Sequence, residues 1–233
     1  MMRLNKYLAD AGIASRRAAD RLIQAGAIKI NGQIVKQLGT QVDPSRDKIT
    51  VRGESARLDK KSVYLMLNKP AGVVSACQPT SVEPHTVTDL IDLPERLFPV
   101  GRLDKDTTGL LLLTNDGELT LRLTHPSFEC EKEYEAILEG EITPSAIRKL
   151  EAGVVLDSQK TSPVKVRQLQ NSVIRLVLHE GKNRHIRRIC RKVGYPVLKL
   201  KRLRVKTLEL GKLPLGKWRF LTPAEVEHLK INS

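Results

Sequence analysis

The segment 101-GRLDKDTTGLLLLTNDG-117 constrains the fold more than any other part of the sequence. Four consecutive leucines favour burial on both faces, which is typical of a strand inside a covered sheet. Gly101 and Gly109 allow tight backbone turns, and the turn-forming run 115–117 closes the strand. The sequence therefore predicts a buried strand over 110–114 that follows a charged loop with Asp104 at its apex.

Length and hydrophobic content are typical of a globular protein. The 233 residues suffice for one large domain or two modest ones, and 40% of them are hydrophobic. No apolar run approaches the roughly 18 residues that a membrane span requires. Residues 1–12 carry charges and lack the apolar core of a signal peptide, so we expect a cytoplasmic protein.

The net charge indicates a polyanionic partner. Lys and Arg total 40 against 26 acidic residues, which gives a formal charge of +14. Such an excess favours nucleic acid through electrostatic steering and counterion release. A membrane surface is the competing partner, but no long basic amphipathic helix supports it. Because aromatic residues make up only 3% of the chain, binding is expected to depend mainly on phosphates and on nucleic-acid shape.

Metal and nucleotide motifs are missing from the sequence. Cys77, Cys130 and Cys190 are far apart and odd in number, so they match neither a zinc pattern nor a disulfide framework. Asp104, Asp106 and the following glycine partly mimic a calcium loop, but the bidentate glutamate is missing. The segment also lacks the spacing of a phosphate-binding loop. We therefore expect neither a metal nor a cofactor.

Residues 1–58 are predicted to form a small domain. Apolar residues recur at helical spacing in 4–11 and 16–25, and Ser15 is a candidate N-cap of the second helix. Segment 27–35 alternates around Asn31-Gly32, a strong hairpin signal, and a further strand is expected at 48–51. The polar segment 54–62 is predicted to be a linker, with the domain boundary between residues 58 and 59.

Residues 59–233 are predicted to form a second domain. Strands are expected at 63–70, 110–114, 132–138, 173–180 and 203–210, and helices at 117–126, 144–153, 183–194 and 223–230. Strands and helices do not alternate regularly, which argues against a doubly wound parallel sheet. The fold class is therefore predicted to be α+β, with a mixed, largely antiparallel sheet flanked by helices.

Basic residues concentrate in two regions. The first lies on the two N-terminal helices and their entry (Arg3, Lys6, Arg16, Arg17 and Arg21). The second runs from Lys182 to Lys206, with 11 Lys/Arg and no acidic residue. Solvated surface helices usually intersperse both signs, so the second region indicates phosphate binding more strongly than an idle surface. From its pattern alone, the Asp104 loop is also compatible with a structural role, in which the carboxylate caps a turn or pairs with Arg102.

These motifs resemble a known family. The segment GRLDKDTTGLLLLTNDG resembles the signature of RNA pseudouridine synthases, in particular the bacterial RsuA-type branch that modifies ribosomal RNA. Segments 68-NKPAGVVS-75, 125-HPSFECEKEY-134 and 180-EGKNRHIRR-188 resemble further family landmarks in the right order. Residues 3–35 resemble the alpha-L RNA-binding module found in a ribosomal protein and several RNA enzymes. Together these likenesses cover nearly the whole chain.

The resemblance implies a reaction and its residues. The family isomerises uridine to pseudouridine in RNA without a cofactor: the N-glycosidic bond breaks, the uracil turns, and C5 joins the ribose. Asp104 matches the essential aspartate, which acts as a nucleophile or as a base at C2′. Tyr134 matches the tyrosine that stacks on the target base, and Arg187 matches the arginine that pairs with the aspartate. Leu200 is expected to pack beside the base, with Lys132 and Arg102 in support.

The resemblance also implies RNA contacts and two departures from the family pattern. Phosphate contacts are expected from both basic regions, at Arg3, Lys6, Arg16, Arg17, Arg21, Lys182, Arg184 and Arg188. His185 stands where the family commonly has glutamine, and Lys206 stands where it usually has glycine. Neither departure removes an essential residue.

The expected function is site-specific uridine isomerisation in ribosomal RNA. Segments 180–188 and 214–225 look more like the large-subunit subgroup, so we favour large-subunit RNA. Small-subunit RNA and transfer RNA stay open as alternatives, as does a non-catalytic RNA-binding factor for ribosome assembly. The expected partner is ribosomal RNA, free or within an assembly intermediate, and the protein is expected to be a monomer.

Overall fold

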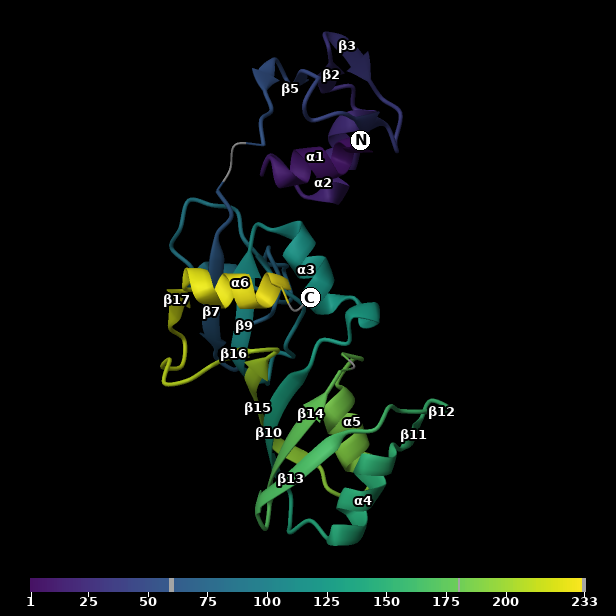
Figure 1. Cartoon of the computed structure of the whole chain (residues 1–233), viewed down its shortest axis with the longest axis vertical. Coiled ribbons are helices and arrows are strands. Elements are labelled where there is room, and N and C mark those ends of the chain that lie inside the picture. The colour runs from purple at the N-terminus through teal and green to yellow at the C-terminus, as the bar shows by residue number, and fades with distance from the viewer. Residues whose placement is uncertain (59–60, 180, 232–233) are drawn as a thin grey trace. The chain divides into compact units, whose positions relative to one another are not determined.

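The structure, a computed structural model, describes residues 1–58, 61–179 and 181–231 (Figure 1). It contains two compact units, the first comprising Met1–Val63 with the short segments Pro94–Arg96 and Asn115–Gly117, and the second the rest of the described chain. The expected boundary between residues 58 and 59 stays a prediction, because 59 and 60 lie outside the described residues. Within the described chain, no helix combines the length and apolarity of a membrane span.

The first unit joins two short helices to short strands. Its helices are α1 (Leu4–Asp10) and α2 (Arg16–Gln24), and its strands are β1 (Met2–Arg3), β2 (Ile28–Ile30), β3 (Gln33–Val35), β4 (Gln41–Val42), β5 (Ile49–Val51) and β6 (Glu54–Ser55). The four strands in the order β3-β2-β5-β6 form an antiparallel sheet, and β1 pairs with β4. The predicted helices and the hairpin are confirmed.

Local signals explain where these elements begin and end. The Ser15 hydroxyl accepts a hydrogen bond from the amide of Ala18, so it caps α2 as predicted. Asn31 and Gly32 both have positive φ, which a two-residue hairpin turn requires. The apolar faces of α1 and α2 then close over the sheet, with Leu8 and Ile23 fully buried. The unit owes its core to these amphipathic faces.

The second unit contains most of the secondary structure. Its helices are α3 (Gly117–Thr124), α4 (Pro144–Ala152), α5 (His185–Lys192) and α6 (Pro223–Ile231), with the 3₁₀ turns η1 (Val87–Leu90) and η2 (Pro126–Phe128). Its strands are β7 (Tyr64–Lys69), β8 (Phe98–Pro99), β9 (Thr108–Thr114), β10 (Lys132–Leu138), β11 (Val155–Leu156), β12 (Gln159–Lys160), β13 (Lys165–Gln170), β14 (Val173–Leu178), β15 (Val197–Val205), β16 (Leu208–Glu209) and β17 (Trp218–Phe220).

One mixed sheet organises this unit. Its strand order is β13-β14-β10-β15-β9-β7-β17, with β16 beside β15 and β8 beside β9. The β9–β15 pair is parallel and the remaining ladders of this sheet are antiparallel. This arrangement confirms the predicted α+β class and the largely antiparallel sheet.

The leucine run forms the centre of that sheet. Leu110, Leu111 and Leu113 are fully buried, and Leu112 is nearly so, which confirms a strand covered on both faces. Leu110 and Leu112 share a core cluster with Leu119 of α3 and Leu229 of α6. In Figure 1, α6 crosses the sheet near β7 and β9, while α4 and α5 lie beside β13 and β14 at the other end. A rigid strand therefore supports the loop that precedes it.

One predicted strand was misplaced. The expected strand over 203–210 is in fact the end of β15 and the short β16, separated by a turn at Lys206. Lys206 has a φ of 50°, a left-handed conformation that costs a lysine more than a glycine. Its amide donates to the carbonyl of Glu131, which holds the turn in place. The turn geometry gives a physical reason for glycine at this position in the family.

Candidate active site

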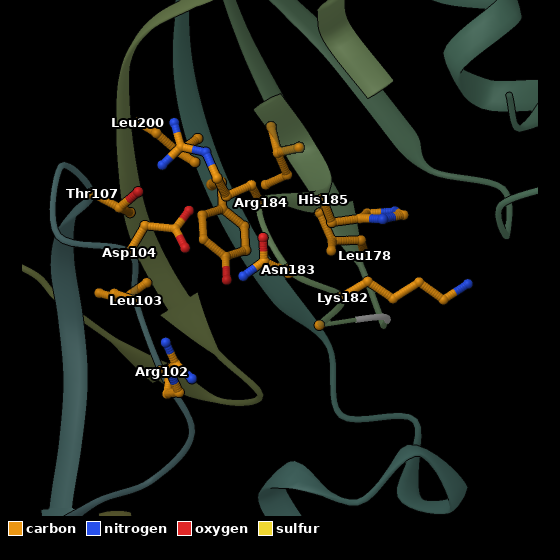
Figure 2. Close-up of a pocket in the computed structure, with 13 residues that line it drawn as sticks. Arg102, Leu103, Asp104, Thr107, Leu178, Lys182, Asn183, Arg184, His185 and Leu200 are labelled. Atoms are coloured by element: carbon orange, nitrogen blue, oxygen red, sulfur yellow. The ribbon is translucent and has the colours of Figure 1, made fainter. Parts of the chain in front are cut away.

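The loop between β8 and β9 presents Asp104 (Figure 2). The Ser75 hydroxyl accepts a hydrogen bond from the Leu103 amide and donates one to the Leu103 carbonyl, at 3.1 and 2.9 Å. The Thr107 amide donates to the Asp104 carbonyl and closes a turn. In Figure 2 the half-buried Asp104 carboxylate points into the cavity, with Leu200 and Arg102 on either side of it in this view. The loop is therefore held at its base while the carboxylate stays accessible.

A buried lysine lies beneath the same loop, and the sequence reasoning missed it. Lys69, at the end of β7, is fully buried, and its ammonium donates to the carbonyls of Pro70 (2.8 Å), Thr107 (2.9 Å) and Lys105 (3.3 Å). Burial lowers the pKa of Lys69 to about 8, although the nearby carboxylates of Asp106 and Asp104 oppose that shift. The apolar strand around it gave no signal of such a role.

The Asp104 carboxylate opens onto a cavity of about 200 Å³. The cavity is lined by Arg102, Leu103, Asp104, Thr107, Tyr134, Leu178, Gly181, Lys182, Asn183, Arg184, His185, Ile186 and Leu200. Its volume is several times the roughly 30 Å³ that a water molecule occupies. The structure thus brings Asp104, Tyr134 and Leu200 together from three separate segments. Most of the lining is polar or charged, and Leu103, Leu178, Ile186 and Leu200 add apolar walls, a combination that suits a small polar ligand.

Tyr134 and its neighbour Arg202 form the floor shared by β10 and β15. Tyr134 is 9% exposed and lies opposite Arg202 in the antiparallel register. The Arg202 guanidinium is buried, donates to the Leu110 carbonyl at 2.7 Å, and lies 3.5 Å from the Tyr134 hydroxyl. Arg202 was counted within the basic region but received no role of its own. Only the strand register shows that it contacts the tyrosine.

The expected ion pair between Arg187 and Asp104 is not formed. Arg187 lies on α5 and pairs instead with Asp106, at 3.2 Å, while it also donates to the carbonyl of Val197. Arg184 pairs with the same Asp106 carboxylate at 3.3 Å. Among the described contacts, the Asp104 carboxylate has no ion pair, either with these arginines or with Arg102. Asp106, two positions after Asp104, forms the ion pairs with both arginines instead.

Three other predicted site residues make contacts that the sequence did not predict. Lys182 lines the cavity, and its side chain extends away from Asp104 in Figure 2. Arg188 forms a 2.6 Å bidentate pair with Asp157, so a phosphate would have to compete with that carboxylate. The ammonium of Lys132 donates to the Cys130 carbonyl at 2.9 Å and lies outside the Asp104 cavity.

Two residues of the cavity wall were not assigned a role. His185, the departure from the family glutamine, is 5% exposed and lines the cavity. Thr107 is 1% exposed, and its hydroxyl has no hydrogen-bond partner among the described residues. A buried hydroxyl without a partner is costly, so it is available to a ligand in the cavity.

The predicted N-terminal contacts lie on the first unit and are mostly exposed. Arg3, Arg16, Arg17 and Arg21 are exposed, while Lys6 is half-buried and pairs with Asp10 at 2.6 Å. An exposed pair of this kind contributes little to stability and can exchange for a phosphate.

The described residues offer no cluster of three or more histidine, cysteine, aspartate or glutamate side chains that could hold a metal ion. The three cysteines are free thiols, and burial raises the pKa of Cys190 to about 12. A thiol with so high a pKa is an inert core group at neutral pH.

Comparison with known proteins decides what this site belongs to. The family model for RNA pseudouridylate synthase matches residues 63–192, more than half of the chain. The chain belongs to this family. The S4 domain model matches residues 2–47, which confirms the expected N-terminal RNA-binding module. As a pseudouridine synthase, the protein isomerises uridine to pseudouridine in RNA.

Full-length relatives agree with the family models. The pseudouridine synthase is 45% identical to the ribosomal large subunit pseudouridine synthase B of Bacillus subtilis (strain 168), covering 99% of this chain and 96% of the relative. It is 40% identical to the dual-specificity RNA pseudouridine synthase RluF of Escherichia coli (strain K12), covering 97% and 77%. A solved pseudouridylate synthase shares 33% identity and a TM-score of 0.73, covering 98% of this chain and all of that one.

Proposed function

We propose that this pseudouridine synthase isomerises one uridine of large-subunit ribosomal RNA, with Asp104 as its catalytic carboxylate. The observation that carries the proposal is the Asp104 carboxylate itself, which enters the cavity without an ion pair to any described residue while its loop is held by Ser75 and Lys69. An unpaired carboxylate on a held loop is free to act on a sugar carbon. We favour large-subunit RNA as the substrate because the Bacillus subtilis relative is named as a ribosomal large subunit pseudouridine synthase.

The cavity accounts for each step of the proposed reaction. A uridine in folded RNA must first leave its stack, which costs a few kcal/mol. Tyr134 supplies an aromatic face for the flipped base, and Leu200 an apolar wall. Asp104 then attacks the sugar or removes its C2′ proton, and the bond between N1 and C1′ breaks. The uracil turns within the same cavity, its C5 bonds to C1′, any bond to Asp104 breaks or the proton taken from C2′ is returned, and the C5 proton is lost to solvent as N1 gains one. Phosphate contacts from Lys182, Arg184 and the N-terminal unit offset the cost of unstacking.

Arg187 enters this scheme through Asp106. Because Asp106 pairs with both Arg184 and Arg187, neither arginine pairs with the Asp104 carboxylate in the described structure. We propose that an RNA phosphate draws Arg184 away, since Arg184 is exposed and its pair is long. Arg187 then supports the reacting carboxylate from α5.

The test maps pseudouridine directly. Unmodified large-subunit RNA, small-subunit RNA and transfer RNA are incubated with the purified protein, and pseudouridines are located by carbodiimide-dependent reverse-transcription stops. We expect one new stop in large-subunit RNA, its loss with Asp104→Asn, and its retention with the matched exposed variant Glu151→Gln. Binding of Asp104→Asn to the same RNA should stay within about twofold of the wild type, because a carboxylate contributes no phosphate contact.

Two other results would change the proposal. A stop only in small-subunit or transfer RNA would change the proposed substrate and leave the proposed reaction unchanged. Equal product from Asp104→Asn would remove Asp104 from its role. If naked RNA gives no stop, the same assay on partly assembled subunits tests an assembly intermediate as the substrate. We further propose that the enzyme acts as a monomer in the cytoplasm, which light scattering of the purified protein and cell fractionation would check.

A further inference from the structure

A second and larger cavity borders the catalytic one. Its volume is about 640 Å³, and it shares the lining residues Arg102, Tyr134, Gly181 and Lys182 with the Asp104 cavity. Asp104 lines only the smaller cavity, so the sugar of the reacting uridine lies in that cavity and not in the larger one. The second cavity is therefore a neighbouring compartment separated from the first by Tyr134.

The deep wall of this second cavity is apolar. Val100, Leu112, Leu123 and Val205 line it, and all four belong to the core cluster of the unit. These residues come from the loop before Asp104, from β9, from α3 and from β15. A preformed apolar wall of this kind binds a planar, poorly hydrated group such as a nucleic-acid base.

The remaining lining is mostly polar and includes four basic side chains, Arg102, Lys132, Lys182 and Arg202. Glu129 is the acidic residue among its described lining. Lys132 keeps donors beyond the one bond that it gives to Cys130, since lysine has three donors. The cavity thus combines a surface for a base with donors for phosphate and carbonyl oxygens.

We propose that this cavity receives the base of a nucleotide next to the target uridine, so that the enzyme reads its substrate on the far side of Tyr134. The assignment rests on the proposed function, because the occupant belongs to the same RNA strand as the reacting uridine. The two cavities share four lining residues, so they adjoin and can hold two nucleotides of one strand. Flipping a neighbouring base costs further unstacking energy, and the apolar wall of the second cavity offsets that cost.

The test combines an RNA change with a protein change. The RNA hairpin that carries the mapped target is made in three forms, one intact and two with an abasic site on the 5′ or the 3′ side of the target. The protein change is Thr124→Trp, because Thr124 is exposed at the end of α3 and lines only the second cavity. The matched control is Leu121→Trp, which lies on the same helix, is 54% exposed and lines neither cavity.

The expected result is a coupling between the two changes. For the wild type, one of the abasic hairpins should lose about tenfold in kcat/KM, a typical effect of removing one stacked base. Thr124→Trp should lose a similar factor on the intact hairpin and show no further loss on that abasic hairpin. Leu121→Trp should behave like the wild type on all three hairpins. Such non-additivity is the signature of two changes that act on one contact.

Other outcomes overturn the assignment. If the wild type processes all three hairpins equally, the cavity holds no neighbouring base. This comparison uses the wild type alone, so it does not depend on the folding of Thr124→Trp. If Thr124→Trp loses activity but keeps the full abasic effect, the base is read elsewhere. If the wild type makes no pseudouridine in any ribosomal RNA, the proposed substrate fails, and the neighbouring-base site fails with it.

Discussion

At the scale of single residues, Lys69 shows how a buried charge holds the Asp104 loop in place. Its ammonium joins the carbonyl of Pro70, which follows β7, to the carbonyls of Lys105 and Thr107, which follow Asp104 in the loop. A charge buried at this depth is tolerated only because it is fully hydrogen-bonded and lies near two carboxylates. The same contacts hold the Asp104 loop against β7, so stability and activity are coupled at this residue.

We predict that Lys69→Met destabilises the protein by about 2 kcal/mol at pH 7, because buried carbonyls lose their donors. The loss relative to the wild type should grow as the pH rises from 8 to 10. The folded-state pKa of Lys69 is about 8 against 10.5 for the free side chain, so in this range the unfolded state binds the extra proton. By linkage, wild-type stability then increases with pH.

The difference in the free energy of unfolding between the wild type and Lys69→Met can be measured by urea unfolding at pH 7, 9 and 10, with the exposed variant Lys149→Met as the control. A difference that stays constant with pH would mean that Lys69 is protonated throughout the range. A pseudouridine assay on the same variants should show lower activity for Lys69→Met alone.

At the scale of elements, the contact between β9 and β15 sets the geometry of the site. Gly109 faces Arg202 in this short parallel pair, and its φ is 104°. A Cβ built at Gly109 would lie 2.2 Å from the Arg202 carbonyl oxygen, closer than any real contact allows. The strands can approach only because residue 109 has no side chain.

Gly109→Ala is therefore expected to cost more than about 4 kcal/mol, or to prevent folding, since backbone on both sides must move. The matched control is Gly140→Ala, which has a φ of 82° but no heavy atom within 4 Å of a built Cβ. Strain alone should cost that variant about 1–2 kcal/mol. Chemical unfolding followed by circular dichroism compares the two, and equal losses would contradict the close approach.

The start of α6 is a second element with a measurable role. Glu225 and Thr222 form a reciprocal capping box, and Glu225 also receives two hydrogen bonds from Arg219, at 2.6 and 2.8 Å. The hydrogen bond from Arg219 is the main reason that the pKa of Glu225 falls to about 2. Because α6 covers the central leucine strand through Leu229, this cap supports the core.

Glu225→Gln can keep the capping bond but loses the carboxylate charge that Arg219 contacts, so it should lower the free energy of unfolding by about 1 kcal/mol at pH 7. The depressed folded-state pKa makes this contribution complete above about pH 4.5, and it is lost as the pH falls toward 2. Thermal unfolding at pH 7, 4 and 3 should therefore show the two proteins converging. A difference that persists unchanged at pH 3 would argue against the ionised carboxylate as its source.

At the scale of the whole molecule, charge directs the enzyme to RNA. The net charge is +14, and the exposed arginines of α2 lie on the S4 unit while the catalytic unit carries the second basic region. Each phosphate contact adds to the dependence of binding on salt concentration. We therefore expect the two units to share the electrostatic part of RNA binding.

The double variant Arg16→Ala/Arg17→Ala should weaken RNA binding and reduce the slope of log K against log salt by roughly 1.5, as two lost phosphate contacts imply. Removing the same charge from α4 with Arg148→Ala/Lys149→Ala should leave the slope nearly unchanged. Fluorescence anisotropy of labelled ribosomal RNA at several salt concentrations measures both. Equal effects of the two variants would indicate a response to net charge alone.

Much of this molecule could be predicted from sequence because the signals are local. The hairpin at Asn31, the cap at Ser15 and the buried leucine strand each depend on residues a few positions apart. The family motifs likewise mark Asp104 and Tyr134 by short, specific runs of residues. The prediction of one strand over 203–210 was wrong because a left-handed turn at Lys206 interrupts it.

The fold class, the family, the basic regions and the loop that carries Asp104 could all be predicted from the order of residues. The pair between Arg187 and Asp106, the position of Lys69 beneath the loop and the second cavity beside Tyr134 became visible in the folded chain alone. Each of these depends on strands and helices that are distant in the chain and meet through the sheet order. Periodicity reports the face on which a residue lies, but contact between faces depends on the register and crossover of the whole sheet.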